Sequence, residues 1–197
     1  MLFRSDLIKE IENLETNIRF RISSIEPNLL TDKIIKFISK SEKFVPHFHI
    51  PLQSGSDSVL KLMRRRYDSS LYKSRIKMIK ELMPEASIGV DVIVGFPGED
   101  DDKFLESMNF IDTLDVSYLH VFTYSERDNT HAITLPKIVN LNTRSKRSKL
   151  MRLLSGRKKS NFYKSKIGNT YNVLFESENK NGYVEGFSEN YIRFKTI

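Results

Sequence analysis

The stretch VDVIVGFPGED, residues 90–100, decides the fold class of this chain. Its first half is a run of β-branched residues, which is typical of a buried strand. The run stops at Gly-Phe-Pro-Gly, residues 95–98, and the carboxylates that follow suit the positive end of a helix dipole. A buried strand that turns at once into a helix predicts a parallel α/β unit.

The same alternation of strand and helix patterns extends over the first 124 residues. The sequence predicts strands over 18–24, 47–52, 87–95 and 116–124. It predicts helices over 5–14, 31–41, 56–66, 69–83 and 101–114. Such alternation is typical of βαβ units around a parallel sheet, either open or closed into a barrel.

Each predicted strand is followed by a loop rich in polar and small residues. The loops are SSIEP (23–27), PLQSGSD (51–57), GFPGE (95–99) and TYSERDNT (123–130). The carboxyl ends of parallel strands meet at one edge of a sheet or barrel, where such folds bind their ligands. We therefore expect the four loops to surround a common ligand.

The pattern changes after Pro136. Residues 143–164 predict a basic helix, with a kink at Ser155-Gly156, and the last 30 residues predict three short antiparallel strands with a hairpin turn at 179–182. The expected organisation is an α/β unit over 1–140, a connecting helix over 141–166 and the start of a small β-domain over 167–197.

Positive charge is concentrated in this second part. The net charge of the chain is +7, yet no acidic residue occurs between Asn129 and Phe175, where eleven Lys and Arg residues lie. A concentrated basic segment predicts nucleic-acid binding, because such a run repels itself unless an anion neutralises it. The alternative is a basic helix that simply faces solvent.

The composition also excludes several classes of protein. The chain contains no cysteine, so it forms no disulfide and ligates no iron–sulfur cluster. No apolar run approaches the roughly 20 residues of a membrane-spanning helix, and the N-terminus lacks the pattern of a signal peptide. We therefore expect a cytoplasmic protein without a membrane partner.

Three motifs together resemble the radical-SAM methylthiotransferase family. They are RISSIEP (21–27), HFHIPLQSGSDSVLKLMRRRY (47–67) and DVIVGFPGEDDDKF (91–104). HVFTYSERDNTHA (120–132) and the strands after residue 168 are similar to the family's last barrel strand and its C-terminal TRAM domain. RISSIEP and YSERDNT most resemble the branch that modifies threonylcarbamoyladenosine beside the tRNA anticodon.

The resemblance implies a partial (βα) barrel of about four parallel strands, a basic helix and a truncated antiparallel TRAM domain. It implies S-adenosylmethionine and a [4Fe–4S] cluster as cofactors, tRNA as the partner, and an electron donor and a sulfur source. The implied reaction is methylthiolation of N6-threonylcarbamoyladenosine. The cofactor-binding residues that it implies are Glu26, Gln53, Ser54, Arg65, Asp91, Gly95, Phe96 and Pro97.

Individual roles follow from the family's pattern. Gly95 is expected to let the backbone approach the cofactor, and Phe96 and Pro97 are expected beside its adenine. Gln53 and Ser54 occupy the positions at which relatives contact the ribose hydroxyls, and Arg65 is expected to bind the cofactor carboxylate. Tyr124 and Arg127 are expected at the target nucleotide, and phosphate contacts are expected from Arg144, Lys146, Arg147, Lys149 and Arg152.

Several residues carry a structural alternative. His47 and His49 are either metal ligands or, as we expect, hydrogen-bonded strand residues, and no metal ligand is assigned. Glu26 is alternatively a turn or cap residue, and Asp91 a buried structural partner. The carboxylates at 99–102 fit the start of a helix better than a metal site.

The chain departs from the family in one respect that bears on activity. The CxxxCxxC motif that ligates the cluster is absent, which predicts a fragment of the enzyme that is inactive alone and has no catalytic residue of its own. Four strands where the family has six also predict an open barrel edge, which favours aggregation. The alternatives are an inactive RNA-binding remnant, or an enzyme acting on another tRNA adenosine or on a ribosomal protein.

Overall fold

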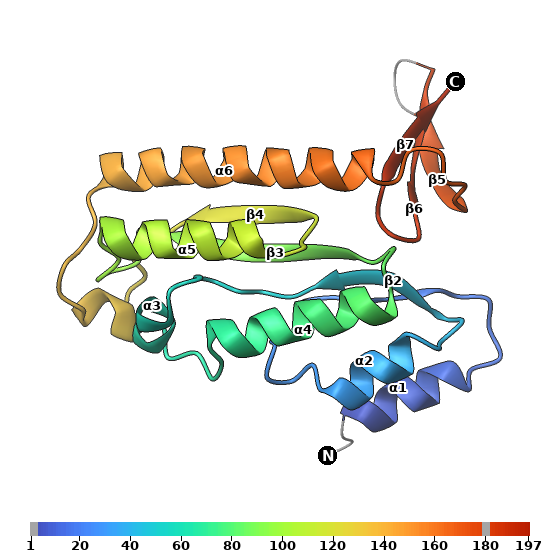
Figure 1. Cartoon of the computed structure of the whole chain (residues 1–197), viewed down its shortest axis with the longest axis horizontal. Coiled ribbons are helices and arrows are strands. Elements are labelled where there is room, and N and C mark those ends of the chain that lie inside the picture. The colour runs from blue at the N-terminus through green and yellow to red at the C-terminus, as the bar shows by residue number, and fades with distance from the viewer. Residues whose placement is uncertain (1–3, 179–181) are drawn as a thin grey trace.

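The computed structural model describes residues 4–178 and 182–197 and contains two sheets (Figure 1). The larger sheet is parallel, in the order β1-β2-β3-β4. Its strands are β1 (Phe20–Ile22), β2 (Phe44–His49), β3 (Ser87–Val94) and β4 (Tyr118–Thr123). The helices that alternate with them are α1 (Arg4–Glu12), α2 (Asp32–Ile38), α3 (Asp57–Leu62), α4 (Ser69–Leu82) and α5 (Asp101–Thr113). The predicted α/β architecture is therefore confirmed.

The two faces of β3 differ, as the period of two along a strand requires. Ile88, Val90, Val92 and Val94 are buried in the core with apolar residues of α2, α4 and α5. Asp91 and its alternate neighbours therefore project from the opposite face. Three of the helices, α2, α4 and α5, begin at capping side chains: the hydroxyl of Thr31 and the carboxylates of Asp68 and Asp100 each accept a hydrogen bond from a first-turn N–H.

The basic segment forms α6 (Leu141–Lys164), a single helix that runs alongside β4 (Figure 1). It continues through Ser155, so the predicted kink is wrong. The Ser155 hydroxyl donates to the Leu119 carbonyl at 3.0 Å and accepts from the Leu119 N–H at 2.9 Å. These bonds satisfy backbone groups on the free side of β4. Among the described residues the sheet ends at β1 and β4 without closing into a barrel, which agrees with the predicted open edge.

A buried ion pair fastens α6 to the turn that ends β3. One Arg147 nitrogen donates to the Glu99 carboxylate at 2.8 Å and to the Glu99 carbonyl at 2.9 Å, and the other donates to Asp101 at 2.7 Å. Glu99 is only 3% exposed and also accepts the Gly95 N–H at 2.7 Å. Burial raises the pKa of Glu99, and the Gly95 N–H and Arg147 oppose that shift.

The smaller sheet is antiparallel, in the order β5-β6-β7, as the sequence predicts. It consists of β5 (Val173–Glu178), β6 (Val184–Ser188) and β7 (Arg193–Thr196), and a short 3₁₀ helix, η1 (His131–Thr134), precedes α6. Of the predicted hairpin turn at 179–182, residues 179–181 lie outside the described part of the chain. Tyr191 joins the two sheets, because its ring lies 4.6 Å from the His47 ring and also stacks on Phe187.

Among the described helices, none is both long and apolar enough to cross a bilayer. α6 is the longest, and it carries the basic residues already noted.

The buried ion pair between Arg147 and Glu99 should contribute measurably to the free energy of unfolding. Arg147→Ala leaves the Glu99 carboxylate buried without its counter-charge, so we expect a loss of about 3–5 kcal/mol in the free energy of unfolding. Arg152→Ala, on the exposed side of the same helix, should change it by less than about 0.5 kcal/mol. Urea denaturation followed by circular dichroism measures both.

A double variant separates lost charge pairing from lost packing. Glu99→Gln with Arg147→Met keeps an acceptor for the Gly95 N–H and removes both charges, so it should recover most of the stability lost in Arg147→Ala. Equal stabilities of Arg147→Ala and Arg152→Ala would contradict the role of the pair.

Candidate functional site

The polar loops that follow β3 and β4 come together at the carboxyl edge of the parallel sheet. A pocket of about 550 Å³ opens there. Its walls come from the end of α3 (Leu62–Arg65), from Ile93 and Phe96 at the end of β3, and from the segment after β4, between Phe122 and Ala132. The predicted loops 95–99 and 123–130 thus share one pocket, and no residue of the predicted loop 51–57 lines it, so the expected meeting of loops is confirmed here for two of the four.

Glu26 brings the first loop to the same place. Its carboxylate accepts a hydrogen bond from Arg65 at 2.8 Å, and both side chains are about one-third exposed. The Arg65 Nε is buried and has no partner among the described residues. The guanidinium at the pocket wall therefore carries one donor that no described residue engages and that is closed to solvent.

Two aromatic side chains form the next part of the wall. The Phe96 and Tyr124 rings lie 5.2 Å apart at an interplanar angle of 72°, an edge-to-face contact. Phe96 is buried, and the Tyr124 hydroxyl is buried without a partner in the described part of the chain. The pocket thus combines apolar ring surface with the partly exposed guanidinium of Arg65, and Arg65 Nε and Tyr124 Oη lie unpaired beneath its surface.

Gly95 has a different reason to be glycine from the one predicted. Its φ is +78°, and a Cβ there would lie 2.4 Å from Arg144 Cγ. The aliphatic stem of Arg144 fills the space that a Cβ would take, and the expected approach of a cofactor to the Gly95 backbone stays a prediction. What approaches the backbone here is the protein itself.

Arg144 and Arg147 do not form the exposed basic face that the sequence predicts. Arg144 is 2% exposed. It donates to Glu126 at 2.5 Å, to the Val139 carbonyl at 2.7 Å and to the Tyr124 carbonyl at 3.0 Å. Since Arg147 is equally occupied by Glu99 and Asp101, the expectation that these two arginines face RNA phosphates is wrong.

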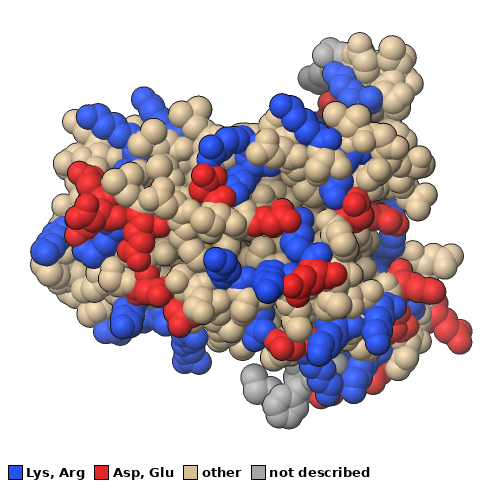
Figure 2. Space-filling view, in the orientation of Figure 1, with Lys and Arg blue, Asp and Glu red and all other residues tan. Residues whose placement is uncertain are grey.

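Lys146, Lys149 and Arg152 are exposed on the other side of α6, as predicted. Figure 2 shows Lys and Arg side chains along the upper margin of the molecule, where α6 and the smaller sheet lie in Figure 1. Arg127 is also exposed and borders the pocket. The exposed Lys and Arg side chains therefore still form a cationic surface, to which the buried Arg144 and Arg147 do not belong.

The other predicted cofactor residues do not line the pocket. Gln53 is held in a left-handed conformation, with φ +71°, and its backbone bridges to β3. Ser54 is 1% exposed and accepts the Ser56 N–H at 3.2 Å, and Pro97 is buried. Asp91 lies on the sheet face away from the helices.

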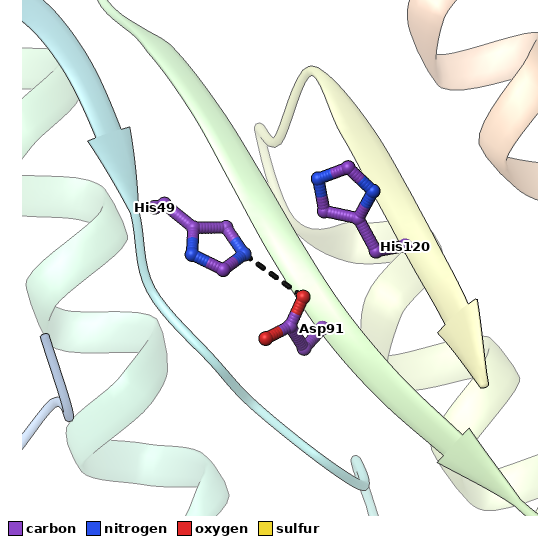
Figure 3. A group of neighbouring side chains, drawn as sticks. All are labelled: His49, Asp91 and His120. Atoms are coloured by element: carbon purple, nitrogen blue, oxygen red, sulfur yellow. Dashed lines mark hydrogen bonds and ion pairs between the residues drawn. The ribbon is translucent and has the colours of Figure 1, made fainter. Parts of the chain in front are cut away.

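Asp91 contacts a cluster of histidines on that face (Figure 3). The His49 Nε2 lies 2.8 Å from the Asp91 carboxylate, and the His120 ring lies 5.4 Å from the His49 ring. His47 is separate: it is hydrogen-bonded to Tyr118 at 2.9 Å, and burial lowers its pKa to about 3. The prediction of hydrogen-bonded strand residues is thus confirmed for both His47 and His49, and the carboxylate neighbour of His49, Asp91, was not predicted from the sequence.

The sequence analysis also missed His120. His120 shares one face of β4 with Tyr118 and Phe122, because every second residue of a strand points to the same side. This period of two could have placed it on the same face as His49. The strand register that joins it to Asp91 is visible only in the structure.

Sequence comparison finds related proteins over nearly the whole chain. Threonylcarbamoyladenosine tRNA methylthiotransferase MtaB from Bacillus subtilis (strain 168) is 36% identical over 194 residues, covering 96% of this chain and 42% of that protein. The tRNA-2-methylthio-N(6)-dimethylallyladenosine synthase of the same organism is 34% identical over 176 residues, covering 89% of this chain and 34% of that protein. The chain thus spans about two-fifths of the length of these curated relatives.

A solved structure shares the fold. Coproporphyrinogen III oxidase (HemN) from Escherichia coli, described as a radical SAM enzyme, aligns with 82% of this chain and 37% of its own, with a TM-score of 0.58 and 14% identity. The sequence model of the Radical SAM superfamily matches residues 2–111, which is more than half of the chain. By that match, and by the parallel sheet with its ligand pocket at the carboxyl edge, the chain belongs to the Radical SAM superfamily.

Proposed function

We propose that this chain is the central and C-terminal part of a tRNA methylthiotransferase that modifies N6-threonylcarbamoyladenosine beside the anticodon. The observation that carries the proposal is the 36% identity to MtaB over 96% of the chain. Dimethylallyladenosine synthases reach nearly the same identity, so the choice of nucleoside rests on the RISSIEP and YSERDNT motifs. The carboxyl edge of the sheet supports a nucleoside ligand, because the pocket there offers aromatic rings and the partly exposed Arg65 guanidinium.

The pocket residues fit S-adenosylmethionine, which when bound supplies radical chemistry for removing a hydrogen atom from an adenine ring. Arg65 would hold the cofactor carboxylate through its partly exposed guanidinium, while Glu26 keeps that group in place. Phe96 and Tyr124 would contact the adenine. Glu26, Gln53, Ser54, Asp91, Gly95 and Pro97 would support the loops around it rather than line the pocket.

The chain does not fit the [4Fe–4S] cluster, because it has no cysteine to ligate one. The thiolates, the electron donor and the sulfur source must therefore come from elsewhere if the reaction takes place. What this chain contributes is the pocket wall and the surface that faces the RNA.

The exposed cations of α6 provide that surface. Lys146, Lys149 and Arg152 would contact tRNA phosphates, and Arg127 and Tyr124 would meet the target nucleotide at the mouth of the pocket. The β5–β7 sheet is the proposed start of a TRAM domain, and the location of the protein is proposed to be the cytoplasm.

The first test measures binding of S-adenosylmethionine to the purified chain by equilibrium dialysis. Arg65→Ala removes a charge-assisted hydrogen bond of about 1.5–3 kcal/mol, so we expect affinity to fall roughly 10- to 100-fold. Arg66→Ala, which removes an exposed neighbouring charge, should leave affinity within about twofold. Binding that is absent from the unaltered chain would favour an RNA-binding remnant instead.

The second test measures tRNA affinity against salt concentration. If Lys146, Lys149 and Arg152 contact phosphates, replacing all three with Ala should reduce the slope of log affinity against log salt by about 2–3. Lys33, Lys36 and Lys73 are exposed on α2 and α4, and their triple Ala variant changes the net charge equally. An equal change in both triple variants would mean that net charge alone sets the affinity.

The third test identifies the nucleoside. The part of B. subtilis MtaB that aligns with this chain is replaced by residues 1–197 and expressed in cells lacking MtaB. We expect mass spectrometry of tRNA digests to recover methylthiolated threonylcarbamoyladenosine. The matched exchange into the B. subtilis dimethylallyladenosine synthase should not restore that enzyme's product, and the reverse pattern would assign the chain to the other branch.

A further inference from the structure

We propose that His49, Asp91 and His120 bind one first-row divalent cation, of the Zn²⁺ or Fe²⁺ class, on the sheet face opposite the helices. The site is distinct from the iron–sulfur cluster of the superfamily, which is held by thiolates that this chain lacks. One ligand atom from each of the three residues lies within 4.8 Å of the other two. The proposal does not depend on the tRNA substrate.

The backbone pairing of three adjacent strands brings these side chains together. Asp91 on β3 is the direct partner of His120 on β4. His49 on β2 pairs with Gly89, two residues before Asp91, so both project from the same side of the sheet. Figure 3 shows the three side chains in front of the sheet, with helices behind it. Their positions are set by the ladder of a parallel sheet and not by mobile loops.

The set of donors suits a transition metal. Two imidazoles and one carboxylate form the three-ligand group typical of zinc enzymes and of non-haem iron sites, and hard cations such as Mg²⁺ prefer oxygen alone. Three protein ligands leave coordination positions for water or for an oxygen of a bound ligand. Those positions face away from the apolar core, because Val90 and Val92 occupy the other side of β3.

The structure also contains an outer contact of the kind that orients metal ligands. His49 presents Nε2 to Asp91 at 2.8 Å, and its Nδ1 lies 3.1 Å from the Ser24 hydroxyl. A histidine ligand commonly engages its second nitrogen in this way, which fixes the ring and the coordinating atom. Ser24 belongs to the loop that follows β1, so this loop also contributes to the proposed site.

His120 is accessible and available for coordination. It is exposed, and within the described residues it makes ring contacts to His49 and Tyr118 and no hydrogen bond. The cation would take the place of the proton in the His49–Asp91 hydrogen bond, and His120 would be its third ligand. Without a cation, the same residues form only one hydrogen-bonded pair, which is the competing explanation.

The test is a titration of the tag-free, chelator-treated chain with Co²⁺, followed by its visible absorption, and with Zn²⁺ by calorimetry. We expect one saturable ion per chain. His120→Gln and Asp91→Asn should each weaken binding at least tenfold, and Ser24→Ala should weaken it by about tenfold through the outer contact. His131→Gln, which alters an exposed histidine on η1, is the matched control and should bind as the unaltered chain does.

Folding of the variants is checked by thermal melting, and the exposed position of His120 means that its replacement should leave the melting temperature unchanged. Absence of saturable binding, or equal affinity in the His120→Gln and His131→Gln variants, would overturn the proposal. So would Co²⁺ binding that leaves the imidazole NMR signals of His49 and His120 unshifted.

Discussion

The buried contact between Arg147 and Glu99 is the constraint on which the rest of the structure depends. Glu99 accepts the Gly95 N–H and the Arg147 guanidinium at the same carboxylate oxygen, so one side chain joins the end of β3 to α6. Arg147 reaches on to Asp101 at the start of α5. A turn, a helix start and a second helix are thereby held in one arrangement, and a charge this deeply buried tolerates no missing partner.

That arrangement explains why a strongly basic helix packs on a protein surface at all. Arg144 and Arg147 bury their charges against Glu126, Glu99 and Asp101, and further along the helix Lys158 donates to the carbonyls of Asp112 and Leu114. The helix therefore divides its cations between two uses. One side forms ion pairs that fix α6 along β4, and the other presents Lys146, Lys149 and Arg152 to solvent. The charge run seen in the sequence is a mixture of packing and surface residues.

The two faces of the parallel sheet likewise have different roles. The helix-covered face is apolar and provides the core. The opposite face carries His47, His49, Asp91, Tyr118 and His120, and Tyr191 of the smaller sheet packs against its amino-terminal part. At the carboxyl edge, the same strands end in the pocket with Arg65 and Tyr124. The polar side chains thus lie on the face and at the edge of the sheet that are outside the apolar core, since burying a polar group without a hydrogen-bonding partner costs free energy.

By itself, the sequence determined the fold class, the order of the elements, the change to antiparallel strands after α6 and the meeting of polar loops at one edge. Those features follow from hydrophobic period, helix caps and the common direction of parallel strands, all of which are local or depend on strand order alone. Only the tertiary structure decided that Gly95 makes room for Arg144, that two of the five cations predicted to contact phosphates are buried, and that His120 lies beside Asp91. These facts depend on which distant side chain fills a given space, and local sequence patterns do not specify contacts between residues that are some thirty to fifty positions apart.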